Sequence, residues 1–251
     1  MDKYTLKTAF RKSFLGVVWR IEADTATGIL AIETRDPDTG VPSFAAIEYS
    51  TGISLIDEIQ YGDRNWALAG VTDGKLILRA WGQNTPEGAG VACIDATTGN
   101  VLWEQFNYTL VSLENRQLVV RHRNFASGYE QYLTPLDGSL TKKNKVINKP
   151  TEPEIVLPKR YIGDTPLFLE GYDIKGELFF CSVEDRNVWA FHEADDPTYR
   201  IRLVVSRGLK MLKDRIVVSD LPKMAPELFF RIKDQLFFIG DNKREIVAYL
   251  V

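Results

Sequence analysis

The sequence has few of the residues on which metal and thiol chemistry depend. Its 251 residues include two cysteines and two histidines. Zinc sites are normally built from three or four closely spaced Cys and His ligands, and no C-x-x-C or H-E-x-x-H pattern occurs here. We therefore expect neither a metal nor another cofactor.

An excess of basic charge and long apolar runs are missing as well. Against 31 Lys and Arg stand 34 Asp and Glu, which gives a net charge of −3 and argues against nucleic acid as a partner. No apolar run approaches the roughly 18 residues that a membrane helix needs. The early "FLGVVW" is shorter than a signal-peptide core, which takes about 7 to 15 apolar residues. We expect a cytoplasmic protein that does not bind a membrane.

The two cysteines, Cys93 and Cys181, are far apart in the chain and lie inside apolar, strand-like runs. Small disulfide-rich domains instead carry several closely spaced cysteines. Both thiols are therefore predicted to be buried and to pack as small hydrophobic groups.

Short runs of β-branched and aromatic residues recur along the chain, each closed by Gly, Asp, Asn or Pro, while helical periodicity is nearly absent. In "VVWRIEAD" (residues 17–24), alternate residues fall on opposite faces of a strand. This pattern predicts an all-β protein.

Two sequence markers, a turn glycine and an apolar triplet, repeat along the chain at a similar distance from each other. "YSTGISLI", "DATTGNVLW" and "PLDGSLT" place Gly52, Gly99 and Gly138 in tight turns, where glycine permits the positive φ that such turns require. An apolar triplet after a turn residue begins upstream of each glycine, in "TGILAI", "DGKLIL" and "NRQLVV". A repeat of about 40 to 47 residues with about four short strands is the period of a β-propeller blade.

The fold class that follows is an all-β propeller of about five blades, with four or six as alternatives, each a four-stranded antiparallel sheet. A strand from "YTLKTAF" near the N-terminus, paired with "EIVAYLV" at the C-terminus, would close the ring. The expected blades are residues 17–61, 62–107, 108–147, 167–207 and 208–251.

A proline-rich segment interrupts the repeat at residues 148–166. Proline inside a sheet removes a ladder hydrogen bond, so this segment is predicted to be an irregular connection between the third and fourth blades. We expect one domain over residues 1–251, because the repeat resumes beyond the connection; a division into two domains there is the alternative.

The stretch "VACIDATTGNVLW" (residues 91–103) resembles the repeat hairpin of quinoprotein and WD40-like propellers, in which a strand ends in a D-x-x-T-G turn and resumes with a Trp-containing run. The match is good in the second blade, partial in the first and third, and weak after residue 140. The chain also resembles uncharacterised bacterial propeller-type proteins of unassigned function. The resemblance implies a fold. It does not imply dehydrogenase activity, because the adjacent cysteines and calcium site of true quinoproteins have no counterpart here.

Alignment on the apolar triplet places Arg79 level with Arg121 and Trp81 level with Arg123, at the same end of equivalent strands. Long glycine-bearing loops follow both strands, as in many binding sites. Arg and Trp are enriched in interface hot spots, and Arg can donate two parallel hydrogen bonds to one carboxylate. These four residues are the predicted partner-binding surface. The alternative is that Trp81 packs between blades and the arginines are solvated.

Our first hypothesis is a non-catalytic interaction or scaffold protein that binds a protein or peptide on this surface. The alternative is a small-molecule enzyme, a hydrolase or lyase, at the mouth of a central channel. That function requires converging carboxylates, or His122 beside one, in a pocket. His122 and His192 are otherwise expected to be structural or solvated, and "DPDTG" (residues 36–40) is expected to be a turn rather than a calcium loop.

Overall fold

A computed structural model describes residues 4–81, 90–125, 127–144, 155–240 and 243–251. Within these ranges the regular structure is β-strand, apart from the 3-10 turn η2 (Leu167–Leu169), and there is no α-helix. This part of the chain thus offers no helix long and apolar enough to cross a membrane. The all-β prediction is confirmed.

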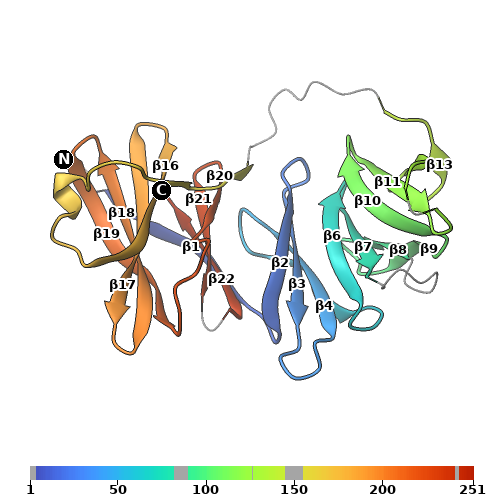
Figure 1. Ribbon diagram of the computed structural model, residues 1–251, viewed down its shortest axis with the longest axis horizontal. Helices are drawn as coiled ribbons and strands as arrows, with labels where there is room; N and C mark the ends of the chain where they lie inside the picture. Colours follow the sequence, from blue (N-terminus) through green and yellow to red (C-terminus); the bar gives the residue numbers. More distant parts are fainter. Residues whose placement is uncertain (1–3, 82–89, 126, 145–154, 241–242) are drawn as a thin grey trace. The chain divides into compact units, whose positions relative to one another are not determined.

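The internal contacts divide the chain into two compact units, unit 1 (Met1–Ser13 and Pro153–Val251) and unit 2 (Phe14–Glu152), which we describe separately. Unit 2 contains three antiparallel four-stranded sheets, whose strands follow one another in sequence order (Figure 1). Sheet I contains β2 (Val17–Asp24), β3 (Ile29–Arg35), β4 (Pro42–Glu48) and β5 (Ser54–Gln60); sheet II contains β6 (Trp66–Thr72), β7 (Lys75–Ala80), β8 (Val91–Asp95) and β9 (Val101–Gln105); sheet III contains β10 (Tyr108–Glu114), β11 (Gln117–His122), β12 (Glu130–Leu133) and β13 (Leu140–Thr141).

Unit 1 contains two antiparallel five-stranded sheets. Sheet IV has the order β15-β16-β17-β18-β19, and sheet V the order β1-β22-β21-β20-β14. The strands of sheet IV are β15 (Lys159–Arg160), β16 (Ile174–Val183), β17 (Arg186–Asp195), β18 (Thr198–Arg207) and β19 (Lys210–Leu221); those of sheet V are β1 (Lys7–Ser13), β14 (Ile155–Val156), β20 (Phe230–Ile232), β21 (Gln235–Gly240) and β22 (Glu245–Leu250).

One turn recurs throughout unit 2. In each copy, the amide of a positive-φ glycine donates to the carbonyl oxygen four residues earlier, at 2.8 to 3.0 Å. Glycine is needed because a Cβ disfavours this backbone region. "DPDTG" is one copy, which confirms it as a turn. The five glycines are Gly28, Gly40, Gly52, Gly99 and Gly138.

Neighbouring sheets of unit 2 pack through buried apolar side chains. One cluster joins sheets I and II, with Ile29 and Phe44 against Leu68 and Leu78. A second joins sheets II and III, so that sheet II is buried on both faces. The strand centres of sheet II, such as "LIL" in β7, are fully buried and apolar for this reason.

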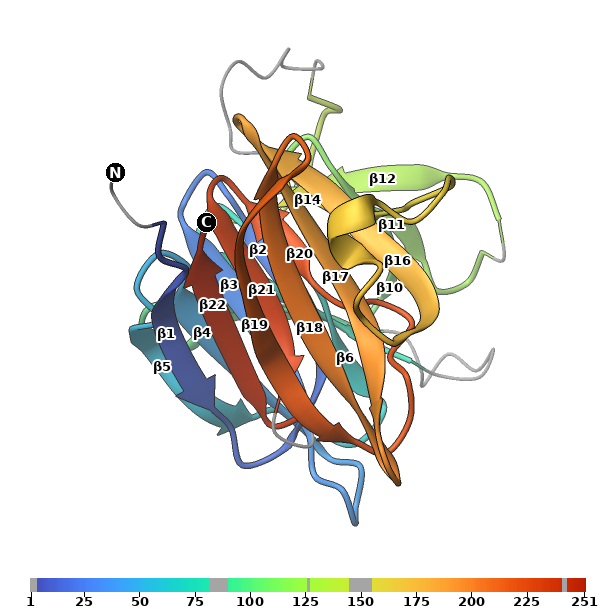
Figure 2. The same ribbon diagram turned by 90° about the vertical axis from the view of Figure 1, so that its left-hand side faces the viewer.

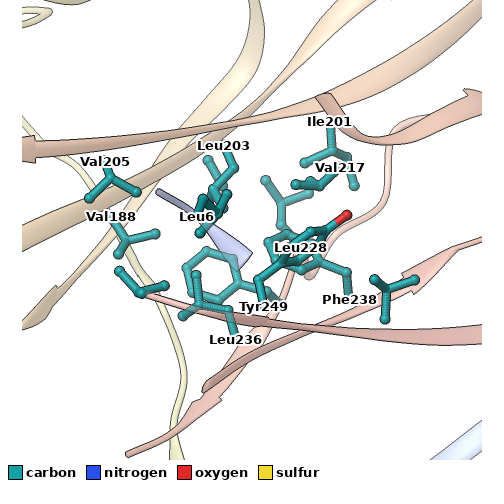
Figure 3. Close-up of a cluster of buried hydrophobic side chains, with 14 of the residues drawn as sticks. Leu6, Val188, Ile201, Leu203, Val205, Val217, Leu228, Leu236, Phe238 and Tyr249 are labelled. Carbon is teal, nitrogen blue, oxygen red and sulfur yellow. The ribbon is translucent and has the colours of Figure 1, made fainter. Parts of the chain in front are cut away.

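In unit 1, a larger cluster fills the space between sheets IV and V. Figure 3 shows Val188, Leu203 and Val205 of sheet IV facing Leu236 and Tyr249 of sheet V. Leu6, just before β1, belongs to the same cluster and is buried. The N-terminal segment is therefore held in unit 1 by apolar burial as well as by strand pairing.

The predicted pairing of the chain ends is confirmed. Figure 2 shows β1 beside β22, and their register runs from Lys7 opposite Leu250 to Ser13 opposite Glu245. With five sheets of four or five antiparallel strands, the architecture is that of a β-propeller of about five blades.

Two details differ from the prediction. The boundary between the fourth and fifth blades at residues 207 and 208 is wrong, because Arg207 and Lys210 close a tight hairpin that makes β19 the last strand of sheet IV. Sheets IV and V also have five strands instead of four, since β15 and β14 each add an edge strand. Both added strands come from the expected connection at 148–166, of which residues 148–154 lie outside the described ranges. The single-domain organisation stays a prediction.

Candidate binding surface

The strand register of unit 2 places three arginines at equivalent positions. The first strand of each sheet has one unpaired residue at the same point of the register, and the residue two positions before it faces an arginine of the second strand. Arg79 and Arg121 are therefore level, as the triplet alignment predicts. The three facing pairs are Val17 with Arg35, Ala67 with Arg79, and Thr109 with Arg121.

Trp81 and Arg123 are equivalent by their backbone hydrogen bonds. The Trp81 amide donates to Asn65 O at 2.6 Å, and the Arg123 amide donates to Asn107 O at 2.8 Å. Each bond ties the end of the second strand to the segment just before the first strand of the same sheet. All four predicted residues thus lie at the same strand end of two neighbouring sheets. The loop residues 82–89 and 126, which were expected to contribute, lie outside the described residues.

Arg79 and Trp81 form a cation–π pair. The Arg79 Cζ lies 3.9 Å from the centroid of the Trp81 ring, within the range of a favourable contact. Trp81 is 56% exposed, so it does not pack between sheets. The pair therefore presents an aromatic ring and a guanidinium together to solvent.

The Arg79 guanidinium is only partly solvated. Its Nε is buried and has no hydrogen-bond partner among the described residues, where no carboxylate forms an ion pair with it either. Burial is the main cause that lowers the pKa of Arg79, and the charge of Arg20 adds to it, while Glu22 and Glu33 act in the opposite direction. Arginine keeps its charge at neutral pH even so. Arg79 is thus a cation with hydrogen-bonding capacity that its described neighbours do not use.

The other two predicted arginines differ from Arg79. Arg121 Nη2 lies 3.3 Å from Glu130 Oε1 in a partly exposed ion pair. The Arg123 side chain is exposed, and no described carboxylate pairs with it. Of the three predicted arginines, Arg79 and Arg123 are therefore the ones without a carboxylate partner in the described part of the chain.

Arg35, the third equivalent arginine, was missed by the sequence reasoning. The apolar triplet of sheet I begins at Ile29, six residues before Arg35, whereas that of sheet II begins at Leu76, three residues before Arg79. Alignment on the triplet therefore does not place Arg35 level with Arg79. The signal that finds Arg35 is its position opposite Val17, two residues before the unpaired Trp19 of β2.

The Arg35 guanidinium is held by a carboxylate and by backbone carbonyl oxygens. It pairs with the fully buried Glu33 at 2.7 Å and donates to the carbonyl oxygens of Arg64 and Trp66 at 2.9 and 3.0 Å. Its Cζ lies 5.5 Å from the ring of Trp19, which is 67% exposed. Because its donors are used in joining sheets I and II, Arg35 is structural, whereas Arg79 at the equivalent position is available.

A cavity of about 470 Å³ opens beside β11 of sheet III. Its lining contains neighbouring rings with centroids 5.1 to 6.1 Å apart, in the order Tyr108, His122, Phe125, Tyr129. The sequence reasoning considered His122 alone, because the cavity forms only when β10 and β12 flank β11. The lining residues are Tyr108, His122, Phe125, Tyr129, Glu130 and Gln131.

The remaining chemically versatile groups are structural. His192 is buried, its Nε2 accepts the Ala225 amide at 3.0 Å, and burial lowers its pKa. Burial raises the pKa of the free Cys93 thiol to about 12 and that of Cys181 to about 11, so neither is a nucleophile at neutral pH. Within the described ranges, no three His, Cys, Asp or Glu side chains gather closely enough to hold a metal ion.

Comparisons with known proteins add a family model and several solved structures. The model is described as "Domain of unknown function (DUF4905)" and matches residues 23–103, which include Arg79 and Trp81. No curated protein matches the chain.

Three solved structures resemble the fold. BamB from Moraxella catarrhalis has 9% sequence identity and a TM-score of 0.36, with coverage of 94% of this chain and 85% of BamB. The β-propeller domain of the trilobed protease from Pyrococcus furiosus has 11% identity and a TM-score of 0.33, with coverage of 88% and 62%. The endo-arabinase from Bacteroides thetaiotaomicron VPI-5482 has 12% identity and a TM-score of 0.29, with coverage of 95% and 92%.

Proposed function

We propose that this protein is a non-catalytic interaction module that binds a carboxylate-bearing protein or peptide segment on the surface formed by Arg79, Trp81, Arg121 and Arg123. The observation that carries the proposal is the state of Arg79, a partly desolvated guanidinium held against an exposed Trp ring without a described carboxylate partner.

A carboxylate that docks on Arg79 gains two parallel hydrogen bonds and meets a cation that has already lost part of its water. The exposed Trp81 ring beside it offers apolar area at low conformational cost. Arg123, at the position on sheet III that is equivalent to Trp81, adds a second available cation, and an extended segment that spans the two sheets can contact both Arg79 and Arg123.

Binding is tested with a library of acidic peptides displayed on phage, followed by affinity measurement for the selected sequences. Arg79→Met keeps most of the side-chain length and removes the charge. We expect it to weaken binding at least about tenfold, as loss of a charge-assisted hydrogen bond does. Trp81→Ala should have a similar effect, and Arg207→Met on unit 1, whose arginine is largely exposed, serves as the matched control.

Equal affinity of wild type, Arg79→Met and Trp81→Ala for every selected peptide would overturn the proposed surface. A further expectation is that affinity falls as salt is raised, since the pairing is electrostatic and partly exposed.

The small-molecule enzyme remains a second candidate because His122 and Glu130 line one cavity. A histidine and a carboxylate at one pocket are the minimum for acid–base chemistry. A metabolite thermal-shift screen, followed by turnover assays on any stabilising compound, tests this function. Turnover that is lost in His122→Gln would favour the enzyme over the interaction module.

We also propose a cytoplasmic location for the protein. The free, buried state of both cysteines supports it, since thiols stay reduced in that compartment. Cell fractionation with an antibody against the chain tests it, and recovery in a secreted or periplasmic fraction would contradict it.

A further inference from the structure

The cavity beside β11 combines aromatic faces with hydrogen-bonding groups. Phe125 is 47% exposed and Tyr129 is 78% exposed, so part of the ring array is open to solvent. A volume of about 470 Å³ falls within the range of small-ligand sites, roughly 300 to 1,000 Å³. Successive rings lie at tilted or edge-on angles, which leaves ring faces unstacked.

Tyr129 is held in an unfavourable backbone conformation. Its φ is +52°, in the left-handed region that a bulky aromatic residue rarely adopts. Its side chain is the most exposed of the rings in the cavity, so burial within the protein gives little in return. A ligand that covers the ring would supply that burial.

The polar groups of the cavity include a ring nitrogen of His122 and the carboxylate of Glu130. His122 Nδ1 accepts the Asn124 amide at 3.3 Å, so the proton of the neutral imidazole lies on Nε2. Glu130 Oε1 pairs with Arg121 Nη2 at 3.3 Å, and a carboxylate with about four lone-pair sites can accept further hydrogen bonds.

We infer that this cavity is a binding pocket for a planar aromatic group that carries an N–H or O–H donor, such as an indole or a phenol. The rings of Phe125 and Tyr129 would contact the faces of the group, and Glu130 would accept its donor hydrogen. The pocket goes beyond the proposed function, because Arg79 and Trp81 are absent from its lining.

The probe is free indole, with 1-methylindole as its matched analogue. The two share the ring system, but 1-methylindole lacks the N–H donor. Binding to the full-length protein is measured by ligand-observed NMR titration. We expect indole to bind with a millimolar or lower Kd and 1-methylindole about tenfold more weakly, the loss expected for a hydrogen bond to a charged acceptor.

Three variants locate the site. Glu130→Met removes the acceptor at similar side-chain length, and it should weaken indole about tenfold and abolish its preference over 1-methylindole. Tyr129→Ser should weaken both probes about fivefold through loss of a ring contact. Trp19→Ala, which removes an exposed aromatic ring outside the cavity, should leave both affinities unchanged. Circular dichroism melting shows whether each variant is folded.

Equal affinities of indole and 1-methylindole for the wild-type protein would overturn the inference, as would undetectable binding of indole at millimolar concentration. Indole binding that survives in both folded variants, Glu130→Met and Tyr129→Ser, would overturn it too.

A peptide arm separates the two sources of such a group. A short Trp-containing peptide that binds more tightly than indole, and loses this gain in Tyr129→Ser, identifies a partner side chain as the ligand; equal or weaker binding identifies a free small molecule. Failure of the Arg79 tests leaves these results untouched, because Arg79 is not part of the pocket.

Discussion

Units 1 and 2 reach similar antiparallel sheets by different local means. Unit 2 uses the glycine turn five times, each closed by a hydrogen bond from the glycine amide. Unit 2 also has two-residue turns, at Asp73-Gly74 and Asn115-Arg116. The described hairpins of sheet IV use only such two-residue turns, between long strands, as at Glu184-Asp185 and Gly208-Leu209. The glycine-turn repeat can therefore be recognised clearly in the sequence of unit 2 but only weakly in that of unit 1.

The two units also differ in the number of arginines that pair with a buried glutamate. In unit 2, the buried Glu33 binds one arginine, Arg35, and accepts the Leu68 amide at 2.8 Å. In unit 1, the buried Glu193 binds two arginines, Arg200 at 2.9 Å and Arg202 at 3.0 Å. Each carboxylate has at least one partner on another strand, Leu68 for Glu33 and both arginines for Glu193, so the loss of either should be costly.

The largest effect is expected for Glu193→Ala. The change leaves Arg200 and Arg202 without their shared carboxylate, and it should lower the free energy of unfolding by about 3 kcal/mol, as for other broken buried pairs. Urea denaturation measures it. Glu177→Ala is the control, because its pair with Arg160 is exposed on both sides and should change stability by less than about 1 kcal/mol. Equal effects of the two variants would contradict the difference in burial.

An intermediate loss of stability is expected when alanine replaces a turn glycine that lies close to another side chain. A Cβ at Gly138 would lie 2.7 Å from Trp103 Cδ2, whereas at Gly99 the nearest atom, Ile56 Cγ2, lies at an ordinary 3.4 Å. Positive φ alone costs about 1 kcal/mol for alanine, and overpacking adds about 1 kcal/mol or more. Gly138→Ala should thus lower stability by about 2 kcal/mol and Gly99→Ala by about 1.

Gly208→Ala in unit 1 sharpens this comparison. Gly208 has a φ of +56° and open space around its Cβ position, so its cost should match that of Gly99→Ala in the same urea assay. A cost for Gly208→Ala as large as that for Gly138→Ala would show that backbone strain, rather than packing on Trp103, sets the order.

The smallest effect concerns the acid sensitivity of the turn at Asp95. The hydroxyl of Thr97 is the main cause that lowers the pKa of Asp95 from 3.8 to about 2, and the amides of Thr97 and Thr98 add to it. Because the folded pKa is depressed, the stabilisation is complete above pH 4 and is lost as the pH falls toward 2. The carboxylate is largely solvated, so we expect only about 1 kcal/mol.

Asp95→Asn checks this origin, since the amide oxygen can still accept the Thr97 and Thr98 amides but does not titrate. Urea unfolding at pH 5, 4, 3 and 2 should show a flatter loss of stability for Asp95→Asn than for wild type. Parallel curves would assign the acid sensitivity to other carboxylates.

The sequence by itself determined the all-β class, the positive-φ glycines and the level positions of Arg79 and Arg121, because turn chemistry and strand alternation act over a few residues. The pairing of the chain ends was predictable for a similar reason, as two short alternating segments had no other obvious partner.

Only the tertiary structure decided how equivalent residues are used. Arg35 and Arg79 share a register position, yet Arg35 binds Glu33 and the carbonyl oxygens of Arg64 and Trp66, whereas Arg79 Nε has no hydrogen-bond partner among the described residues. The cavity at His122 forms only when β10, β11 and β12 pair, and the assignment of β19 to sheet IV follows from its pairing with β18. The different partners of Arg35 and Arg79 are set by packing between neighbouring sheets, which no local pattern encodes.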